Sequence, residues 1–275
     1  MKILIGLVSE NYHHPPVLMG KLIASEIESS IDVLIVVPEN GHLENAEAVQ
    51  DQVREDFNGF PVEIYIRQGK SADVYQDFLA GEDYNLVIMD PNRGTGFRQR
   101  PKINQAIKDS DDLSILLSEF PKPRLEKILL ATACKQDDYS LVTEGAKLAR
   151  ALDAELTMLH VISGNVPTMY TGLDQLEETV EELLQTDTPF AKHLRRGISV
   201  LNEFGVDSDV MIRRGVPLEE IVRETQINNY DLVVIGATKV SEDIRGRLLG
   251  NLTTRLINEL KLPVLIIDKC LFEKE

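Results

Sequence analysis

An internal repeat is the feature of this sequence that most constrains its fold. Lys2-Ile3-Leu4 recurs as Lys127-Ile128-Leu129, 125 positions later. With that offset held, identical residues continue without a gap: Val17 and Val142, Gly20 and Gly145, Ala24 and Ala149, Leu34 and Leu159, Val36 and Val161. From Ile66 onward the offset is 146: Ile66 and Ile212, Arg67 and Arg213, Gly69 and Gly215, Tyr84 and Tyr230, Leu86 and Leu232. The sequence therefore predicts a tandem duplication, with an insertion of 21 residues (146 − 125) near 164–186 of the second copy.

Each copy alternates short apolar runs with stretches of helical periodicity. In the second copy, strands are expected at 126–132, 154–162, 207–215, 231–237 and 263–268, and helices at 139–153, 188–205 and 217–230. Strands that alternate with helices of this length need crossover connections, which give a parallel sheet. The nearly continuous apolar strands fit a sheet covered on both faces. We therefore predict an α/β fold of two tandem five-stranded, mainly parallel sheets with helices on both faces, a Rossmann-like architecture.

The turn-forming segment Glu119-Phe120-Pro121-Lys122-Pro123 separates the two copies. We expect one domain at residues 1–120 and a second at 124–275, called here the N-terminal half and the C-terminal half. Their last strands, 113–117 and 263–267, are expected to pair inside one chain, because pairing hides the open N–H and C=O groups of two sheet edges. The sequence leaves open a homodimer and an unidentified protein partner.

Composition and charge narrow the class of protein. The formal net charge is −16, which opposes binding to a nucleic acid backbone. No apolar run reaches the length of a membrane span, and the first residues do not resemble a signal peptide. The two cysteines, Cys134 and Cys270, are too few for a disulfide framework. We therefore expect a cytoplasmic protein without nucleic acid or membrane partners, and no residues at metal-ligand spacing predict a metal.

The loop at 236–251, GATKVSEDIRGRLLGN, follows an apolar strand and precedes a helical pattern. In sheets of this kind, ligands bind beyond the carboxyl ends of the strands, where the strand order switches. Glycine allows a phosphate to approach backbone N–H groups, and the next helix adds the positive end of its dipole. The loop is consistent with a phosphate-binding site, and equally with an exposed glycine turn with solvated basic residues.

The chain resembles the universal stress proteins over nearly its whole length. The segments that carry this resemblance are KILLATACKQDDYSLVTEGAKLARALDAELTMLHV, RRGVPLEEIVRETQINNYDLVVIGATK and GNLTTRLINELKLPVLIID. The resemblance implies a five-stranded α/β unit that often pairs through its last strand. It also implies, for one branch of the family, ATP binding through a Gly-x2-Gly-x9-Gly-Ser/Thr signature and an aspartate after the first strand.

The C-terminal half departs from that signature. Gly236 matches the first glycine, Lys239 replaces the second, Gly250 matches the third after one additional residue, and Asn251 stands where Ser or Thr is usual. Ala133 occupies the aspartate position. We expect a weakened site in this half alone, able to hold ATP or another phosphate-bearing ligand with little selectivity. The candidate ligand residues are Ala133, Val161, Gly236, Lys239, Gly250, Asn251 and Thr253.

The N-terminal half departs further. Asp90 stands at the first glycine position, Arg100-Pro101 at the terminal Gly-Ser pair, and Val8 at the aspartate position. A carboxylate repels a phosphate, and proline removes an N–H donor. This half is therefore expected to hold no nucleotide.

Three classes of function remain, and no catalytic residues are identified for any of them. The first is a non-enzymatic stress-response protein that serves as an interaction scaffold, with vestigial or weak nucleotide binding in the C-terminal half. The second is an ATP-binding switch, hydrolysing slowly or not at all, that uses this half only. The third is an adenylating enzyme of a related fold, but no SGGxDS-type loop follows either first strand. Ala133 and Lys239 favour the first class.

Overall fold

The computed structural model describes residues 1–10, 14–90, 113–120, 122–133, 138–162, 180–237, 255–256, 258–268 and 271–272. The N-terminal half contains strands β1 (Lys2–Val8), β2 (Ser30–Val37), β3 (Val62–Gln68), β4 (Leu86–Met89) and β5 (Ser114–Leu117), with helices α1 (His14–Glu26), α2 (Leu43–Asp56) and α3 (Ser71–Leu79). The C-terminal half contains β6 (Lys127–Thr132), β7 (Glu155–Ile162), β8 (Ser208–Arg214), β9 (Leu232–Gly236) and β10 (Val264–Ile267), with α5 (Asp138–Leu152), α6 (Val180–Leu184), α7 (Pro189–Glu203) and α8 (Pro217–Ile227). The α/β fold with mainly parallel strands is confirmed.

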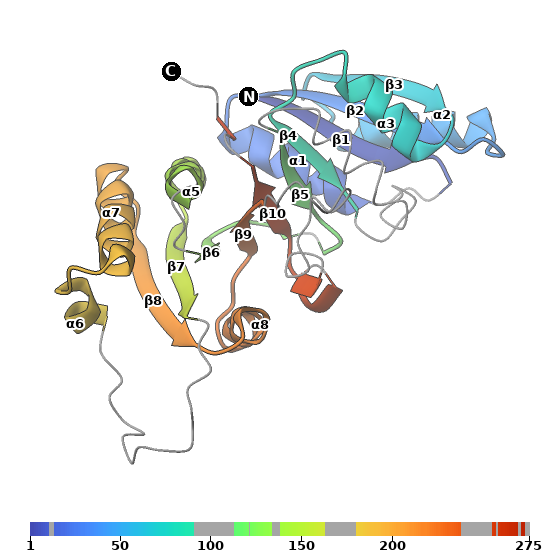
Figure 1. The fold of residues 1–275 in the computed structure, drawn as a ribbon. Helices are drawn as coiled ribbons and strands as arrows, with labels where there is room; N and C mark the ends of the chain where they lie inside the picture. The colour runs from blue at the N-terminus through green and yellow to red at the C-terminus, as the bar shows by residue number, and fades with distance from the viewer. Residues whose placement is uncertain are drawn as a thin grey trace.

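All ten strands form one sheet, in the order β3-β2-β1-β4-β5-β10-β9-β6-β7-β8 (Figure 1). Each half repeats the same internal order, with its first strand between its second and fourth. Within each half the neighbouring strands are parallel. The structure thus places the duplicated sequence in two units of identical strand order.

The two halves meet where β5 and β10 pair antiparallel, with Leu117 opposite Val264 and Ile115 opposite Ile266. The expected pairing of the last strands is therefore confirmed. Within each half the strands are parallel, but the two halves pair antiparallel. The carboxyl ends of β1–β4 and those of β6–β9 therefore lie on opposite sides of the sheet, each side being a row of strand ends called here a strand-end edge.

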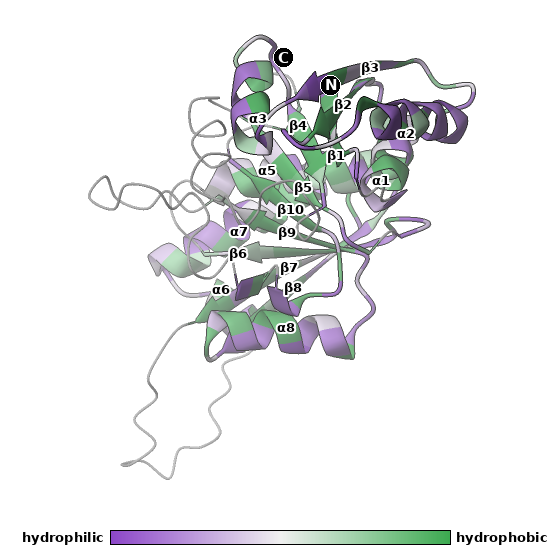
Figure 2. Ribbon diagram, turned by 90° about the vertical axis from the view of Figure 1, so that its right-hand side faces the viewer, coloured by the Kyte–Doolittle hydropathy of each residue, from purple (hydrophilic) through white to green (hydrophobic). Residues whose placement is uncertain are grey.

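Helices cover both faces of the sheet, as the apolar strands require (Figure 2). One buried cluster joins the sheet to α1, α2, α5 and α7, and a second joins its other face to α3 and α8. The strands of the central region are buried along nearly their whole length. The α8 helix ends at Ile227, before the expected residue 230, because Asn228 adopts an extended backbone conformation. Within the expected insertion near 164–186, the structure describes the helix α6.

Paired glycines show that the repeat extends to backbone geometry. Gly69 and Gly215 have φ of 152° and 147°, and Gly59 and Gly205 have φ of 84° and 64°. These values lie where side chains are strained, so glycine is required at both turns of each half. Gly20 and Gly145 pack closely against the sheet: an added Cβ would lie 2.4 Å from Ile5 Cδ1 and 2.7 Å from Leu130 Cδ1 respectively, so these core side chains would have to shift.

We expect Gly20→Val to destabilise the protein by about 2 kcal/mol or more, because the added side chain overpacks the contact between α1 and β1. Leu18→Val on the same helix, where the side chain is 43% exposed, is the matched control. It should change the free energy of unfolding by less than about 0.5 kcal/mol. Chemical denaturation measures both variants, and equal effects would contradict the packing argument.

Candidate functional site

The switch in strand order of the C-terminal half lies between β6 and β9, and the predicted ligand residues gather at their carboxyl ends. Ala133 follows β6 and is exposed, Gly236 ends β9 and is half-buried, and Val161 is buried near the end of β7. Since β6 pairs with both β7 and β9, these three residues belong to neighbouring strands, about 4.8 Å apart. Lys239, Gly250, Asn251 and Thr253 lie outside the described residues.

Among the residues that the structure describes, no packing contact requires glycine at position 236. An added Cβ would have Leu141 Cδ2 as its nearest neighbour, at 3.4 Å, which is an ordinary van der Waals contact. Its φ also lies outside the left-handed region. Gly236 therefore differs from Gly20, Gly145 and Gly215, whose small size or conformation the fold demands. At the carboxyl end of β9, Gly236 thus contributes no side chain, and the Ala237 N–H after it donates to the Ile267 carbonyl at 2.8 Å.

In the N-terminal half, the equivalent positions at the strand ends are buried. Val8 and Asp90, which correspond to Ala133 and Gly236, are 5% and 3% exposed. The strand β1 extends through Val8, which pairs with Val36, and the Ser9 N–H then donates to the Val36 carbonyl at 3.0 Å. In contrast, β6 ends one residue earlier, at Thr132. The two halves thus share a strand order but differ in access to the strand ends.

A polar cluster that the sequence analysis missed adjoins the open edge. The carbonyl of Thr132 accepts a hydrogen bond from His160 Nδ1 at 2.8 Å, and Thr132 Oγ1 lies 3.3 Å from His193 Nε2. His160 is buried, and its ring packs against Phe190 with the centroids 4.8 Å apart. Spacing could not have revealed this cluster, because its members come from β6, β7 and α7.

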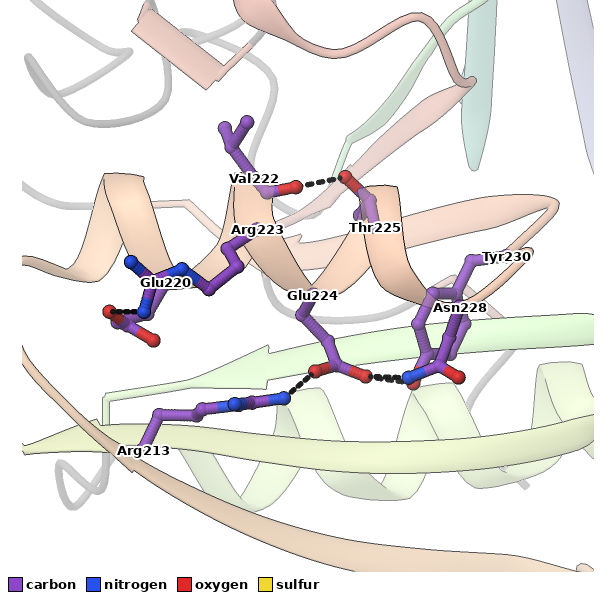
Figure 3. Close-up of polar contacts among 8 residues, drawn as sticks. All are labelled: Arg213, Glu220, Val222, Arg223, Glu224, Thr225, Asn228 and Tyr230. Atoms are coloured by element: carbon purple, nitrogen blue, oxygen red, sulfur yellow. Dashed lines mark hydrogen bonds and ion pairs between the residues drawn. The ribbon is translucent and has the colours of Figure 1, made fainter.

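A second polar cluster surrounds the fully buried carboxylate of Glu224 on α8 (Figure 3). Arg213 from β8 forms an ion pair with it, while Asn228 Nδ2 and Tyr230 OH donate to it at 2.6 and 3.0 Å. Desolvation raises the pKa of Glu224, but these hydrogen bonds outweigh it, so the pKa lies below the ordinary value. Burial and the bond to Glu224 raise the pKa of Tyr230 to about 12. Because Tyr230 precedes β9, the cluster extends away from the open edge and fixes α8 to the sheet.

These features define a doubly wound α/β protein with an open strand-end edge in its C-terminal half. Residues 124–268, slightly more than half of the chain, match the model of the universal stress protein family. The chain belongs to that family.

Relatives of known sequence and structure agree with this assignment. A universal stress protein of Methanocaldococcus jannaschii is 26% identical over 144 residues, which are 52% of this chain and 82% of that protein. A universal stress protein from Archaeoglobus fulgidus has a similar structure, with a TM-score of 0.66 and 16% identity over 97% of this chain and 98% of the other. A functionally unknown protein from Pseudomonas aeruginosa also has a similar structure, with a TM-score of 0.66 and 18% identity over 98% of this chain and 92% of the other. At these identities the structures show the fold, and they show it for both halves.

In the part of the chain that the structure describes, no helix has the length and apolar character needed to cross a membrane. Within the same residues, no group of three or more His, Cys, Asp or Glu side chains is placed to hold a metal ion.

We expect Glu224→Ala to destabilise the protein by about 3 kcal/mol or more at pH 7, because it leaves Arg213 without its buried partner. Glu219→Ala, at an exposed position of the same helix, is the control. Since the pKa of Glu224 in the folded protein lies below its ordinary value of 4.5, the carboxylate stabilises fully above about pH 4.5. That contribution is lost as the pH falls through the lower, folded-state value. Denaturation at several pH values should therefore show the wild-type advantage shrinking in acid, and a constant advantage would refute this role.

Proposed function

We propose that this protein is a tandem universal stress protein that acts as a non-enzymatic stress-response scaffold for a protein partner. Its C-terminal half holds a phosphate-bearing ligand weakly, and its N-terminal half holds none. The observation that carries this proposal is the contrast between equivalent positions: exposed Ala133 and half-buried Gly236 in one half, buried Val8 and buried Asp90 in the other.

The side chains at the open strand-end edge support a ligand that the protein recognises through its phosphate group. Ala133, Val161, Gly236 and Ala237 present small or apolar side chains at the ends of β6, β7 and β9. None of them can accept a hydrogen bond from a ribose hydroxyl through its side chain. The Ala237 N–H already donates to the Ile267 carbonyl at 2.8 Å, so the proposed anion lies beyond this bond and is recognised by its charge and shape. The proposed site therefore recognises phosphate and not the nucleoside.

Calorimetric titration with tripolyphosphate and with ATP tests this recognition. We expect both ligands to bind with similar affinity, and both with a Kd weaker than about 1 µM, corresponding to less than about 8 kcal/mol. If wild-type protein preferred ATP by more than about tenfold, roughly 1.4 kcal/mol, the nucleotide switch would be favoured over the scaffold. If neither ligand bound, the ligand part of the proposal would fail.

Ala133→Asp should create a preference for ATP over tripolyphosphate, which the wild-type protein is expected to lack. A carboxylate at the exposed end of β6 can accept from a ribose hydroxyl, and such charge-assisted bonds contribute about 1.5–3 kcal/mol. We expect ATP to bind this variant at least about tenfold more tightly than tripolyphosphate. Ala80→Asp, which adds the same charge at an exposed position after α3, should leave the two affinities equal. An ATP preference in both variants, or in neither, would contradict the assigned position of the ligand.

Gly236→Ala distinguishes an effect on ligand access to the strand end from an effect on the stability of the fold. The added methyl group has room against Leu141, so the melting temperature should stay within about 2 °C of wild type. The same methyl group narrows the approach to the backbone, so the affinity for tripolyphosphate should fall about tenfold. Gly81→Ala, an exposed position with its nearest neighbour at 3.7 Å, is the matched control and should change neither quantity. Unchanged binding by Gly236→Ala would place the ligand elsewhere.

A further inference from the structure

The last residue of β6 is held by histidines from two other elements. Thr132 accepts through its carbonyl from His160 of β7, and its hydroxyl contacts His193 of α7. Because a carbonyl can only accept, the His160 proton on Nδ1 is fixed by this contact. Both polar groups of Thr132 that face these rings are therefore engaged, one residue before exposed Ala133.

Each ring is itself held in place. His160 lies directly opposite Thr132 in the pairing of β6 with β7, and Phe190 covers its ring. His193 and Phe190 share α7, whose start is fixed by Thr188: the Ala191 N–H donates to Thr188 Oγ1 at 3.1 Å. The contacts to Thr132 thus come from a strand and a capped helix, which are rigid elements.

The N-terminal half lacks every member of this arrangement. By the repeat offsets, Leu7 stands for Thr132, Ile35 for His160, Glu44 for Phe190 and Glu47 for His193. Leu7 and Ile35 are buried apolar residues there, and the pairing of β1 with β2 runs one residue further, through Val8. The histidines occur in the half whose first strand ends early and whose edge is open.

We infer that His160 and His193 are positioning residues of the ligand edge. They hold Thr132 so that the chain leaves the sheet at Ala133, which keeps the strand end open where β1 of the other half stays paired. This role rests on the proposed function of the C-terminal half. It assigns no contact between either histidine and the ligand.

Substitutions by Asn and Gln distinguish the hydrogen bonds that the two histidines make to Thr132 from their contribution to packing. His160→Asn keeps a donor at the position of Nδ1, whereas His160→Gln moves it to the position of Nε2. His193→Gln keeps a polar group at the position of Nε2, whereas His193→Asn falls short of Thr132. We expect His160→Asn and His193→Gln to bind tripolyphosphate within about threefold of wild type, and the other two to lose about tenfold or more, the cost of one hydrogen bond.

Hydrogen exchange of the unliganded protein gives a readout that does not depend on binding. Peptides spanning 129–140 should exchange faster in His160→Gln and His193→Asn than in the two conservative variants. His42→Gln, at an exposed position before α2, is the control and should match wild type in both assays.

Failure of the positioning role and failure of the proposed ligand binding give different results. If all four histidine variants exchanged alike, the positioning role would be overturned, whatever the wild-type affinity. If the exchange pattern appeared as expected but wild type did not bind tripolyphosphate, the proposed ligand would fail, and the inference for the ligand edge would fail with it. Equal loss of affinity in the Asn and Gln variants of each histidine would assign these residues to packing alone.

Discussion

The antiparallel pairing of β5 with β10 sets the architecture of this protein. The two parallel halves become one continuous sheet, because the edge strands β5 and β10 pair with each other at the junction. The same pairing turns the two halves in opposite directions. Their switch points, between β1 and β4 and between β6 and β9, are separated by β4, β5, β10 and β9, about 20 Å of sheet. Each strand-end edge must therefore be completed by residues of its own half.

The two halves differ at equivalent positions. In the N-terminal half Val8 and Asp90 are buried and the pairing of β1 extends through Val8, whereas in the C-terminal half Ala133 is exposed and Gly236 is half-buried. The structural interior diverges as well. Tyr84 donates to Asp32 at 2.6 Å, but its counterpart Tyr230 donates to Glu224, whose own counterpart is Phe78. The duplicated framework is constant, while the polar groups within it are specific to each half.

Much of the fold could be predicted from the sequence because the repeat and the apolar periodicity record local constraints. Gly69 and Gly215 were matched by the repeat, and the pairing of 113–117 with 263–267 followed from duplication. For the candidate site, the structure places Ala133, Val161 and Gly236 near the ends of neighbouring strands, and the predicted residues of the glycine loop after Ala237 lie outside the described structure. The contacts of Thr132 with His160 and His193, and of Glu224 with Arg213, could not be predicted. They join residues from separate elements, and only the register of β6 with β7 and the position of α7 bring them together.

Hydrogen exchange with and without tripolyphosphate tests the asymmetry between the halves most directly, because it locates the ligand without assuming its affinity. The account predicts that saturating ligand slows exchange in peptides covering 129–140 and 232–256. It predicts no change in peptides that cover the equivalent positions, 4–15 and 86–110. Protection of both edges, or of the N-terminal edge alone, would contradict the account.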